Sequence, residues 1–196
     1  MMIFALAACG DDILGKGEMK LGTVNGLTWE NEFIGIGCTM DDDWTFKTDD
    51  EILAMNKLTQ DMVTDDLADL LKDADLVYDM AAATSTDLSN MMVTLQKLNS
   101  LQLAALNIAN ELEKSYDISE SSLINMGCAN LTHSISTITF DGKTFDALVI
   151  SASISGLTMN QTTFAIKCNG YLASISVTTV GEYDMADLID NFYVLD

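Results

Sequence analysis

The chain has 196 residues, and 48% of them are hydrophobic, which is enough for one domain with a sizeable core. It has 30 acidic residues against nine basic ones, all of them lysine, so its formal net charge is -21. Nucleic-acid binding requires a basic surface that neutralises phosphates, and an anionic membrane surface repels an acidic domain. The charge therefore excludes nucleic acid as a partner, and the apolar content excludes a disordered chain.

The first nine residues are uncharged and mostly apolar, and they end in Leu6-Ala7-Ala8-Cys9 before a polar run begins. This pattern is typical of the end of a secretory signal. The four residues resemble the bacterial lipobox, in which the cysteine thiol is acylated and becomes the mature N-terminus. The basic and early hydrophobic parts of a signal are missing, so we expect the chain to begin inside its signal. A soluble protein with an apolar first strand is the alternative.

Three segments follow from this interpretation. Residues 1–9 are the remnant of a lipoprotein signal, residues 10–26 are a flexible tether rich in glycine and acidic residues, and residues 27–196 form a single domain. No segment reaches the roughly 18 consecutive apolar residues of a transmembrane helix. We therefore expect an extracytoplasmic protein, anchored by lipid at Cys9 to the outer face of the cell membrane.

In the first half of the domain, Asn25-Gly26 indicates a hairpin turn, followed by strands over 33–39 and 44–46. Thr48 and Glu51 fit a capping box that opens a helix to about residue 57. Apolar residues at helical spacing predict a second helix over 63–74. Two strands are then expected, over 76–83 and 90–98.

The second half begins with a predicted helix over 101–114 and a shorter one from a cap at Ser119 to Met126. Four strands follow, joined in part by hairpin turns, over 131–140, 144–154, 159–168 and 171–180. Asp184 is expected to cap a last helix whose apolar face includes Met185, Leu188, Ile189 and Phe192. Helices separate groups of strands rather than following every strand, which predicts an α+β fold. We expect an antiparallel sheet of about six to eight strands with helices packed on it.

Several strand and cap patterns resemble a group of secreted lipoproteins of low-GC Gram-positive bacteria. The matching segments are Asn31-Glu32-Phe33-Ile34-Gly35-Ile36-Gly37-Cys38, Trp44-Thr45-Phe46, Asp49-Asp50-Glu51-Ile52 and Tyr78-Asp79-Met80-Ala81. The order of elements is also similar to the PsbP-like fold, an antiparallel sheet sandwiched between helices. The resemblance covers residues 28–196 and implies no catalytic residues.

Cysteine and histidine are the first candidates for chemistry. Apart from Cys9, the chain has Cys38, Cys128 and Cys168, which allow at most one disulfide; burial as small hydrophobic side chains is slightly favoured. His133 is the only histidine and cannot complete a Cys/His zinc site of usual spacing. It could act as a general base beside a serine, but no G-x-S-x-G motif supports this, so a partly solvated strand residue is favoured.

Acidic and aromatic residues suggest two binding sites. Clustered carboxylates suit calcium, and the candidate ligands are Asp41, Asp42, Asp43, Asp49 and Asp50. The EF-hand pattern is absent, so a solvated acidic surface is favoured, and no other cofactor is expected. Trp29, Trp44 and Phe46, with Phe33 nearby, could form a ligand platform, although strand aromatics more often belong to the core.

Two function hypotheses result. The first is a non-enzymatic, membrane-anchored binding module that contacts a protein or small ligand through its sheet edge or the loop over 41–44. The alternative is a secreted hydrolase that uses carboxylates, or a serine with His133.

Overall fold

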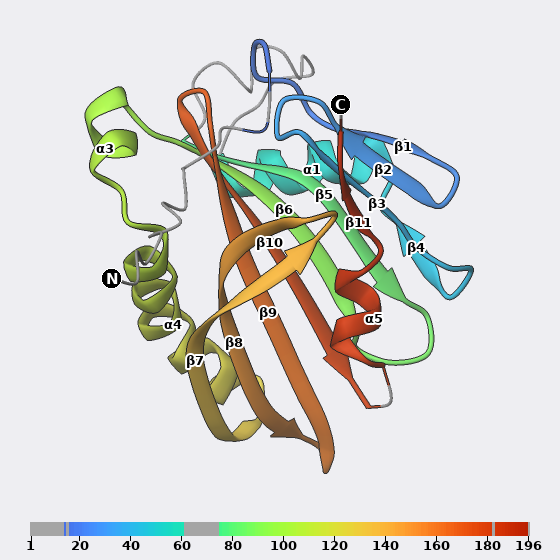
Figure 1. The fold of residues 1–196 in the computed structure, drawn as a ribbon. Coiled ribbons are helices and arrows are strands. Elements are labelled where there is room, and N and C mark those ends of the chain that lie inside the picture. Colours follow the sequence, from blue (N-terminus) through green and yellow to red (C-terminus); the bar gives the residue numbers. More distant parts are fainter. Residues whose placement is uncertain (1–13, 15, 61–74, 182, 196) are drawn as a thin grey trace, which may run out of the picture.

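The computed structural model describes residues 14, 16–60, 75–181 and 183–195, and its strands form two antiparallel sheets (Figure 1). The small sheet has the order β1-β2-β3-β11 and the large sheet has the order β4-β5-β6-β10-β9-β8-β7. The small-sheet strands are β1 (Thr23–Asn25), β2 (Thr28–Asn31), β3 (Ile36–Thr39) and β11 (Phe192–Val194). The large-sheet strands are β4 (Trp44–Phe46), β5 (Leu76–Thr84), β6 (Asn90–Lys97), β7 (Cys128–Phe140), β8 (Lys143–Ile154), β9 (Leu157–Cys168) and β10 (Tyr171–Val180).

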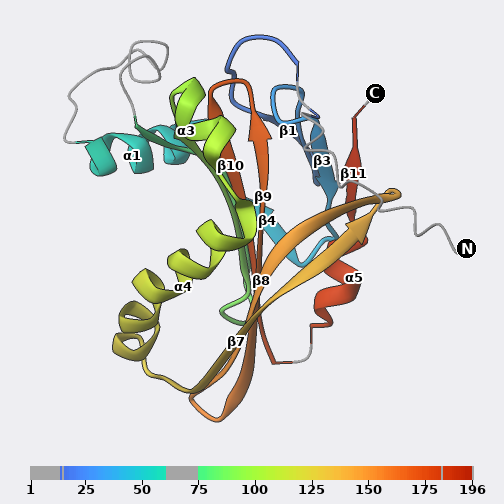
Figure 2. The ribbon, with the colours of Figure 1, turned by 60° about the vertical axis from the view of Figure 1, so that its left-hand side comes forward.

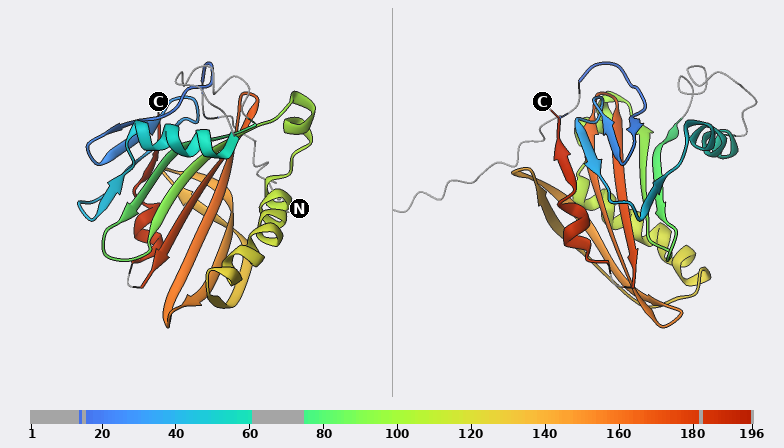
Figure 3. Two further views of the ribbon diagram at one scale, coloured as in Figure 1. Left: turned by 180° about the vertical axis from the view of Figure 1, so that it is seen from behind. Right: turned by 90° about the vertical axis from the view of Figure 1, so that its right-hand side faces the viewer.

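The layers are clearest from the side (Figure 2). The described helices are α1 (Asp49–Gln60), α3 (Ser100–Ala105), α4 (Ile108–Asn125) and α5 (Met185–Ile189). Helices α1, α3 and α4 lie on one side of the large sheet, and the small sheet and α5 lie on the other (Figures 2 and 3). The α+β class with antiparallel strands and packed helices is thus confirmed, with the strands divided between two sheets.

The core has two parts because the large sheet is apolar on both faces. Along β10, Ala173, Ile175 and Val177 face the small sheet, whereas Leu172 packs with α4 residues on the opposite face. This alternation follows from the two-residue period of a strand. Full burial of a valine, leucine or isoleucine side chain contributes roughly 1.5–3 kcal/mol to stability, so both apolar faces of the large sheet are required for stability.

Several sequence predictions hold in the structure. The Thr48 backbone N–H donates to Glu51 Oε2 at 2.9 Å and the Glu51 backbone N–H donates to Thr48 Oγ1 at 3.4 Å, which is the expected capping box of α1. The strands expected from residue 76 to residue 98 and from 131 to 180 are present as β5 to β10. The helix expected over 63–74 lies outside the described residues, and the resemblance to the PsbP-like fold stays a prediction.

The helical break after residue 114 is a correction. Helix α4 is continuous through this position, and the break lies at Leu106 and Asn107, between α3 and α4. Asn107 caps α4 by accepting the Asn110 N–H at 2.9 Å. Ser119 does not cap a helix, because its hydroxyl donates to the Ser115 carbonyl at 2.7 Å inside α4. The asparagine caps therefore decide where these helices begin.

Two further boundaries differ from prediction. Phe33 and Ile34 lie in a turn before β3, and Phe192 belongs to β11 rather than to the last helix. Of the tether expected over 10–26, the structure describes residues 14 and 16–26. Its second half lies against the domain: Met19 and Leu21 pack on the core and β1 pairs with β2. Among the described residues, no helix is long and apolar enough to cross a membrane.

Candidate functional site

Strand β5 contains a bulge at Asp79. Tyr78 pairs with Thr94 and Met80 pairs with Val93, so Asp79 is an extra residue on the β5 side of the ladder. Asn56 of α1 contacts the backbone at this point, because its Oδ1 accepts the Tyr78 N–H at 2.7 Å and its Nδ2 donates to the Tyr78 carbonyl at 2.9 Å. Bulges redirect side chains and are frequent beside functional sites.

The Asp79 carboxylate connects β5 to the N-terminal segment and to β2. Its Oδ1 accepts the Gly22 N–H at 2.6 Å, and its Oδ2 accepts a hydrogen bond from Asn31 Nδ2 at 2.9 Å. Asn31 in turn accepts the N–H groups of Phe33 and Ile34 on its Oδ1 and donates to the Lys20 carbonyl. Both side chains are buried and their polar atoms are partnered, as buried polar groups require.

Burial raises the pKa of Asp79 from 3.8 to about 6, although the hydrogen bonds from Gly22 and Asn31 lower it. Desolvation disfavours the charged form, and here it outweighs the two hydrogen bonds. Both donors are neutral, and no cation contributes to the shift. Asp79 is therefore a buried carboxylate without a counter-charge among the described residues.

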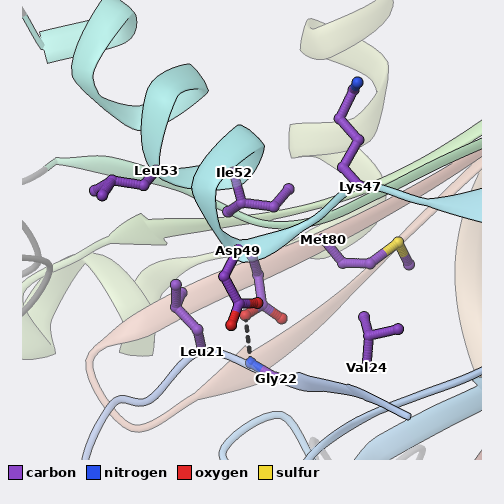
Figure 4. Close-up of a pocket in the computed structure, with 9 residues that line it drawn as sticks. Leu21, Gly22, Val24, Lys47, Asp49, Ile52, Leu53 and Met80 are labelled. Carbon is purple, nitrogen blue, oxygen red and sulfur yellow. Dashed lines mark hydrogen bonds between the residues drawn. The ribbon is translucent and has the colours of Figure 1, made fainter. Parts of the chain in front are cut away.

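A pocket of about 130 Å³ lies beside this carboxylate (Figure 4). Its walls come from the N-terminal segment, α1 and β5. The lining residues are Leu21, Gly22, Val24, Lys47, Asp49, Ile52, Leu53, Asp79 and Met80. Lys47 directs its ammonium away from the pocket and pairs with Glu51 at 3.1 Å, whereas Asp49 directs its carboxylate towards Gly22 (Figure 4). The pocket is thus apolar with negative charge at one side.

The other unusual feature is the outermost strand β7, which ends the large sheet. Its inner side pairs with β8, and among the described residues no backbone hydrogen bond joins residues 129–139 to any further element. We call the outer side of residues 129–139 the β7 edge. Strand β7 has 13 residues and includes no lysine, aspartate or glutamate. A long edge strand without charge or proline is open to pairing with another chain.

The opposite end of the large sheet is protected. Strand β4 has only three residues, and it follows the acidic turn formed by Asp41, Asp42 and Asp43. Short strands and adjacent charges discourage pairing with another chain. The two ends of the large sheet therefore differ: the β7 end is long and uncharged and open to an added strand, whereas the β4 end is short and flanked by acidic residues.

His133 lies between Thr132 and Ser134 in the sequence, but its side chain contacts helix α4. Its Nε2 is 3.0 Å from Glu113 Oε1 of α4, and its ring stacks on Tyr116 with centroids 3.6 Å apart. The side chain is partly exposed. These contacts favour a role in joining α4 to β7 over a role as a general base.

The cysteines described by the structure are all free and buried. Cys38 and Cys168 are fully buried, and burial raises the pKa of each thiol to about 12. The Cys128 thiol lies 3.8 Å from the Met159 sulfur. These surroundings agree with cysteine as a small hydrophobic residue. Cys9 lies outside the described residues.

The candidate calcium ligands occupy two segments, the turn before β4 and the first turn of α1. Asp41 accepts the Asp43 N–H at 3.0 Å, and Asp49 and Asp50 begin α1. Within residues 16–60 and the other described parts, no three or more His, Cys, Asp or Glu side chains are arranged to hold a metal ion. Calcium binding stays a prediction for the chain.

The aromatic ligand platform is not exposed. Trp29 and Trp44 are 0% and 2% exposed and belong to the core between the sheets, while Phe46 and the nearby Phe33 pack with the same cluster. The burial of both indole rings favours the core interpretation. Their Nε1 atoms have no hydrogen-bond partner among the described residues.

Asp79 is one of 30 acidic residues, and it is not among the candidate site residues predicted from the sequence. A distinguishing signal is present, because Asp79 is the one charged residue in the strand sequence Leu76–Thr84. Strand β7 has 13 residues without Asp, Glu or Lys, but residues 147–166 also lack these residues, so the lack of charge is a weak signal for the β7 edge. Neither signal reveals the bulge or the place of β7 at the end of the sheet.

No family model matches the chain, and no curated protein is significantly similar to it in sequence. Among solved structures, the chain is similar to LpqN, described as involved in cell envelope biogenesis of Mycobacterium tuberculosis. The two share 16% sequence identity with a TM-score of 0.40, and the match covers 82% of this chain and 83% of LpqN. At this level of similarity the function has to be inferred from the chain's own residues.

Proposed function

We propose that the protein is a non-enzymatic, lipid-anchored binding module outside the cell membrane, which binds an extended segment of a partner protein at the β7 edge. The observation that supports this proposal is the unpaired outer side of a long, uncharged strand. An added strand satisfies the unpaired N–H and C=O groups of such an edge, and pockets or side-chain pairs then provide specificity.

The charge distribution indicates the chemistry of the partner. A net charge of -21 steers basic molecules towards the domain and repels acidic ones, including a second copy of this chain. The β7 edge itself is uncharged, so strand pairing there does not require the desolvation of a charge. The partner segment is therefore uncharged where it pairs and flanked by lysine or arginine. Its side chains meet a strand rich in serine and threonine, residues that form favourable cross-strand pairs.

Lipidation at Cys9 is part of the same proposal. Leu14 already packs against the core, and five residues extend at most about 18 Å between Cys9 and this point. An acylated Cys9 thus holds the domain close to the membrane surface. A single acyl chain anchors weakly, whereas the several chains of a lipoprotein anchor stably.

A synthetic peptide tests the strand addition. The peptide has alternating threonine and isoleucine residues with lysines at both ends and a fluorophore for anisotropy. We expect saturable binding that weakens by about tenfold or more in the Ser134→Lys variant, because an edge lysine opposes strand pairing and repels the flanking lysines. The matched control is Thr45→Lys on β4, which should bind as the unchanged protein does. Both positions are exposed, so neither variant perturbs the core.

Control peptides locate the source of the affinity. A proline at the centre of the peptide removes a backbone donor and should abolish binding. Glutamate in place of the flanking lysines should weaken it through repulsion. Equal binding of all three peptides, or equal loss in Ser134→Lys and Thr45→Lys, contradicts the proposal, as does self-association of the domain in preference to peptide binding.

The anchor is tested separately. The chain is expressed in a bacterium behind a complete lipoprotein signal and labelled with a clickable fatty acid. We expect label and membrane partition in the unchanged protein and loss of both in Cys9→Ala. Membrane partition of Cys9→Ala equal to that of the unchanged protein contradicts lipidation at this residue, and leaves the peptide experiment unaffected.

A further inference from the structure

The pocket beside Asp79 is distinct from the β7 edge and has a chemistry of its own. Its apolar walls come from the N-terminal segment, α1 and β5, and negative charge lies at one side (Figure 4). Lys47 is the one cation among the lining residues, and it is paired with Glu51 rather than with Asp79. The lining groups are therefore complementary to a cation with an apolar body.

Within the part of the chain that the structure describes, the buried carboxylate has no counter-charge. Gly22 and Asn31 donate hydrogen bonds to Asp79, but both groups are neutral. An ionised carboxylate that is removed from water without a cation raises the free energy of the folded state. A carboxylate accepts about four hydrogen bonds, so Asp79 retains acceptor capacity beyond these two donors. A ligand ammonium would supply both the charge and the missing donors.

We propose that this pocket binds the ammonium group of a small primary alkylamine, with the ammonium at Asp79 and the alkyl chain against Val24, Ile52 and Met80. A volume of about 130 Å³ equals that of about four water molecules at roughly 30 Å³ each, which suits an ammonium group and a few methylene groups. An ammonium has three donors, which the carboxylates of Asp79 and Asp49 that line the pocket can accept.

Propylammonium chloride is the probe, and 1-propanol is the neutral control of the same size. Binding is followed by NMR through the Gly22 amide and the Met80 methyl group in the full chain. We expect saturable shifts of both signals with propylammonium and none with 1-propanol. Tetramethylammonium, which is a cation without donors, should bind more weakly. Equal shifts with 1-propanol, or no saturable shift with propylammonium, overturn the proposal.

Substitutions show whether the Asp79 carboxylate is responsible for propylammonium binding. Asp79→Asn should weaken propylammonium binding by about tenfold or more, because a hydrogen bond to a charged group is lost with the ion pair. Asp75→Asn, at an exposed position before β5, removes the same charge and should have no effect. Val24→Phe fills the pocket at a position that is 40% exposed and leaves Asp79 in place. Binding that persists in Val24→Phe overturns the proposal even where Asp79→Asn does not fold.

The pH dependence of binding gives an independent readout. Asp79 has a pKa of about 6, so propylammonium should bind about tenfold more weakly at about pH 5 than at about pH 8. The other titratable groups near it are Asp49 and Lys47 in the pocket and Cys168 on β9, whose pKa Asp79 raises. The pH dependence should disappear in Asp79→Asn. Its persistence in that variant overturns the assignment of the ammonium to Asp79.

Discussion

The Asp79 region and the β7 edge use polar groups in opposite ways. Around Asp79, hydrogen bonds of Gly22 and Asn31 fix the N-terminal segment to the domain, and the Asn56 side chain joins α1 to β5. Along β7, the outer backbone groups have no partner among the described residues, and most of the exposed side chains are serine and threonine. Substitution should therefore affect stability strongly in the first region, and binding with little effect on stability in the second.

The largest expected effect on stability is that of Asn31→Ala. This substitution removes the hydrogen bonds to Asp79, Lys20, Phe33 and Ile34, and it leaves the buried N–H groups of Phe33 and Ile34 without this acceptor. We expect the free energy of unfolding to fall by about 3–4 kcal/mol. Asn90→Ala removes one exposed hydrogen bond, to the Leu88 carbonyl, and should cost less than about 1 kcal/mol in the same denaturant titration. Similar losses of unfolding free energy in Asn31→Ala and Asn90→Ala would contradict the greater sensitivity of the Asp79 region.

The second effect is a pH dependence of stability caused by Asp79. Its folded pKa, about 6, lies above the unfolded value of 3.8, so the folded state binds this proton more tightly. The contribution to stability is therefore fully present below about pH 4 and is lost as the pH rises to about 6, by about 3 kcal/mol in total. The difference in unfolding free energy between the unchanged protein and Asp79→Asn isolates this group from the other acids. A difference that is constant between these pH values contradicts the buried, uncompensated carboxylate.

Gly22→Ala tests how closely the N-terminal segment packs against Trp29. A Cβ atom at this position would lie 2.8 Å from Trp29 Cε2 and 2.9 Å from the Glu30 carbonyl oxygen. Such overpacking should cost about 2 kcal/mol, measured as a fall in unfolding free energy. In the double variant Gly22→Ala with Trp29→Phe, the smaller ring leaves room for the new Cβ atom. The fall in unfolding free energy should therefore be smaller than the sum of the two single losses. Additive losses of unfolding free energy would show that the N-terminal segment does not pack closely against the Trp29 ring.

The substitution expected to change stability least is His133→Ala on β7. His133→Ala removes one partly exposed contact to Glu113 and the stacking on Tyr116, and it should cost no more than about 1 kcal/mol. Circular dichroism should show an unchanged fold, and thermal unfolding measures the loss. A hydrolytic activity that falls about 100-fold in this variant would instead identify His133 as a general base.

Local patterns predicted the regular elements well, since strand alternation and the Thr48 capping box depend on neighbouring residues. They failed where distant parts of the chain decide the structure. Residues 19–25 have the composition of a tether, yet Asp79, more than 50 positions away, holds Gly22 in place. Asn107 rather than Ser119 begins α4, because the cap depends on which side chain reaches a free N–H. Similarly, the sequence of β7 shows an uncharged strand, but its place at the end of the sheet follows from the pairing of all seven strands.

Hydrogen exchange with and without the lysine-flanked peptide tests whether the protein binds an extended segment at the β7 edge. We predict that saturating peptide slows the exchange of amides within residues 129–139, while amides of β4 exchange as in the free protein. The lysine variant Ser134→Lys should show no such protection at the same peptide concentration. Protection confined to β4, to the pocket at Asp79 or to no segment at all would contradict binding at the β7 edge.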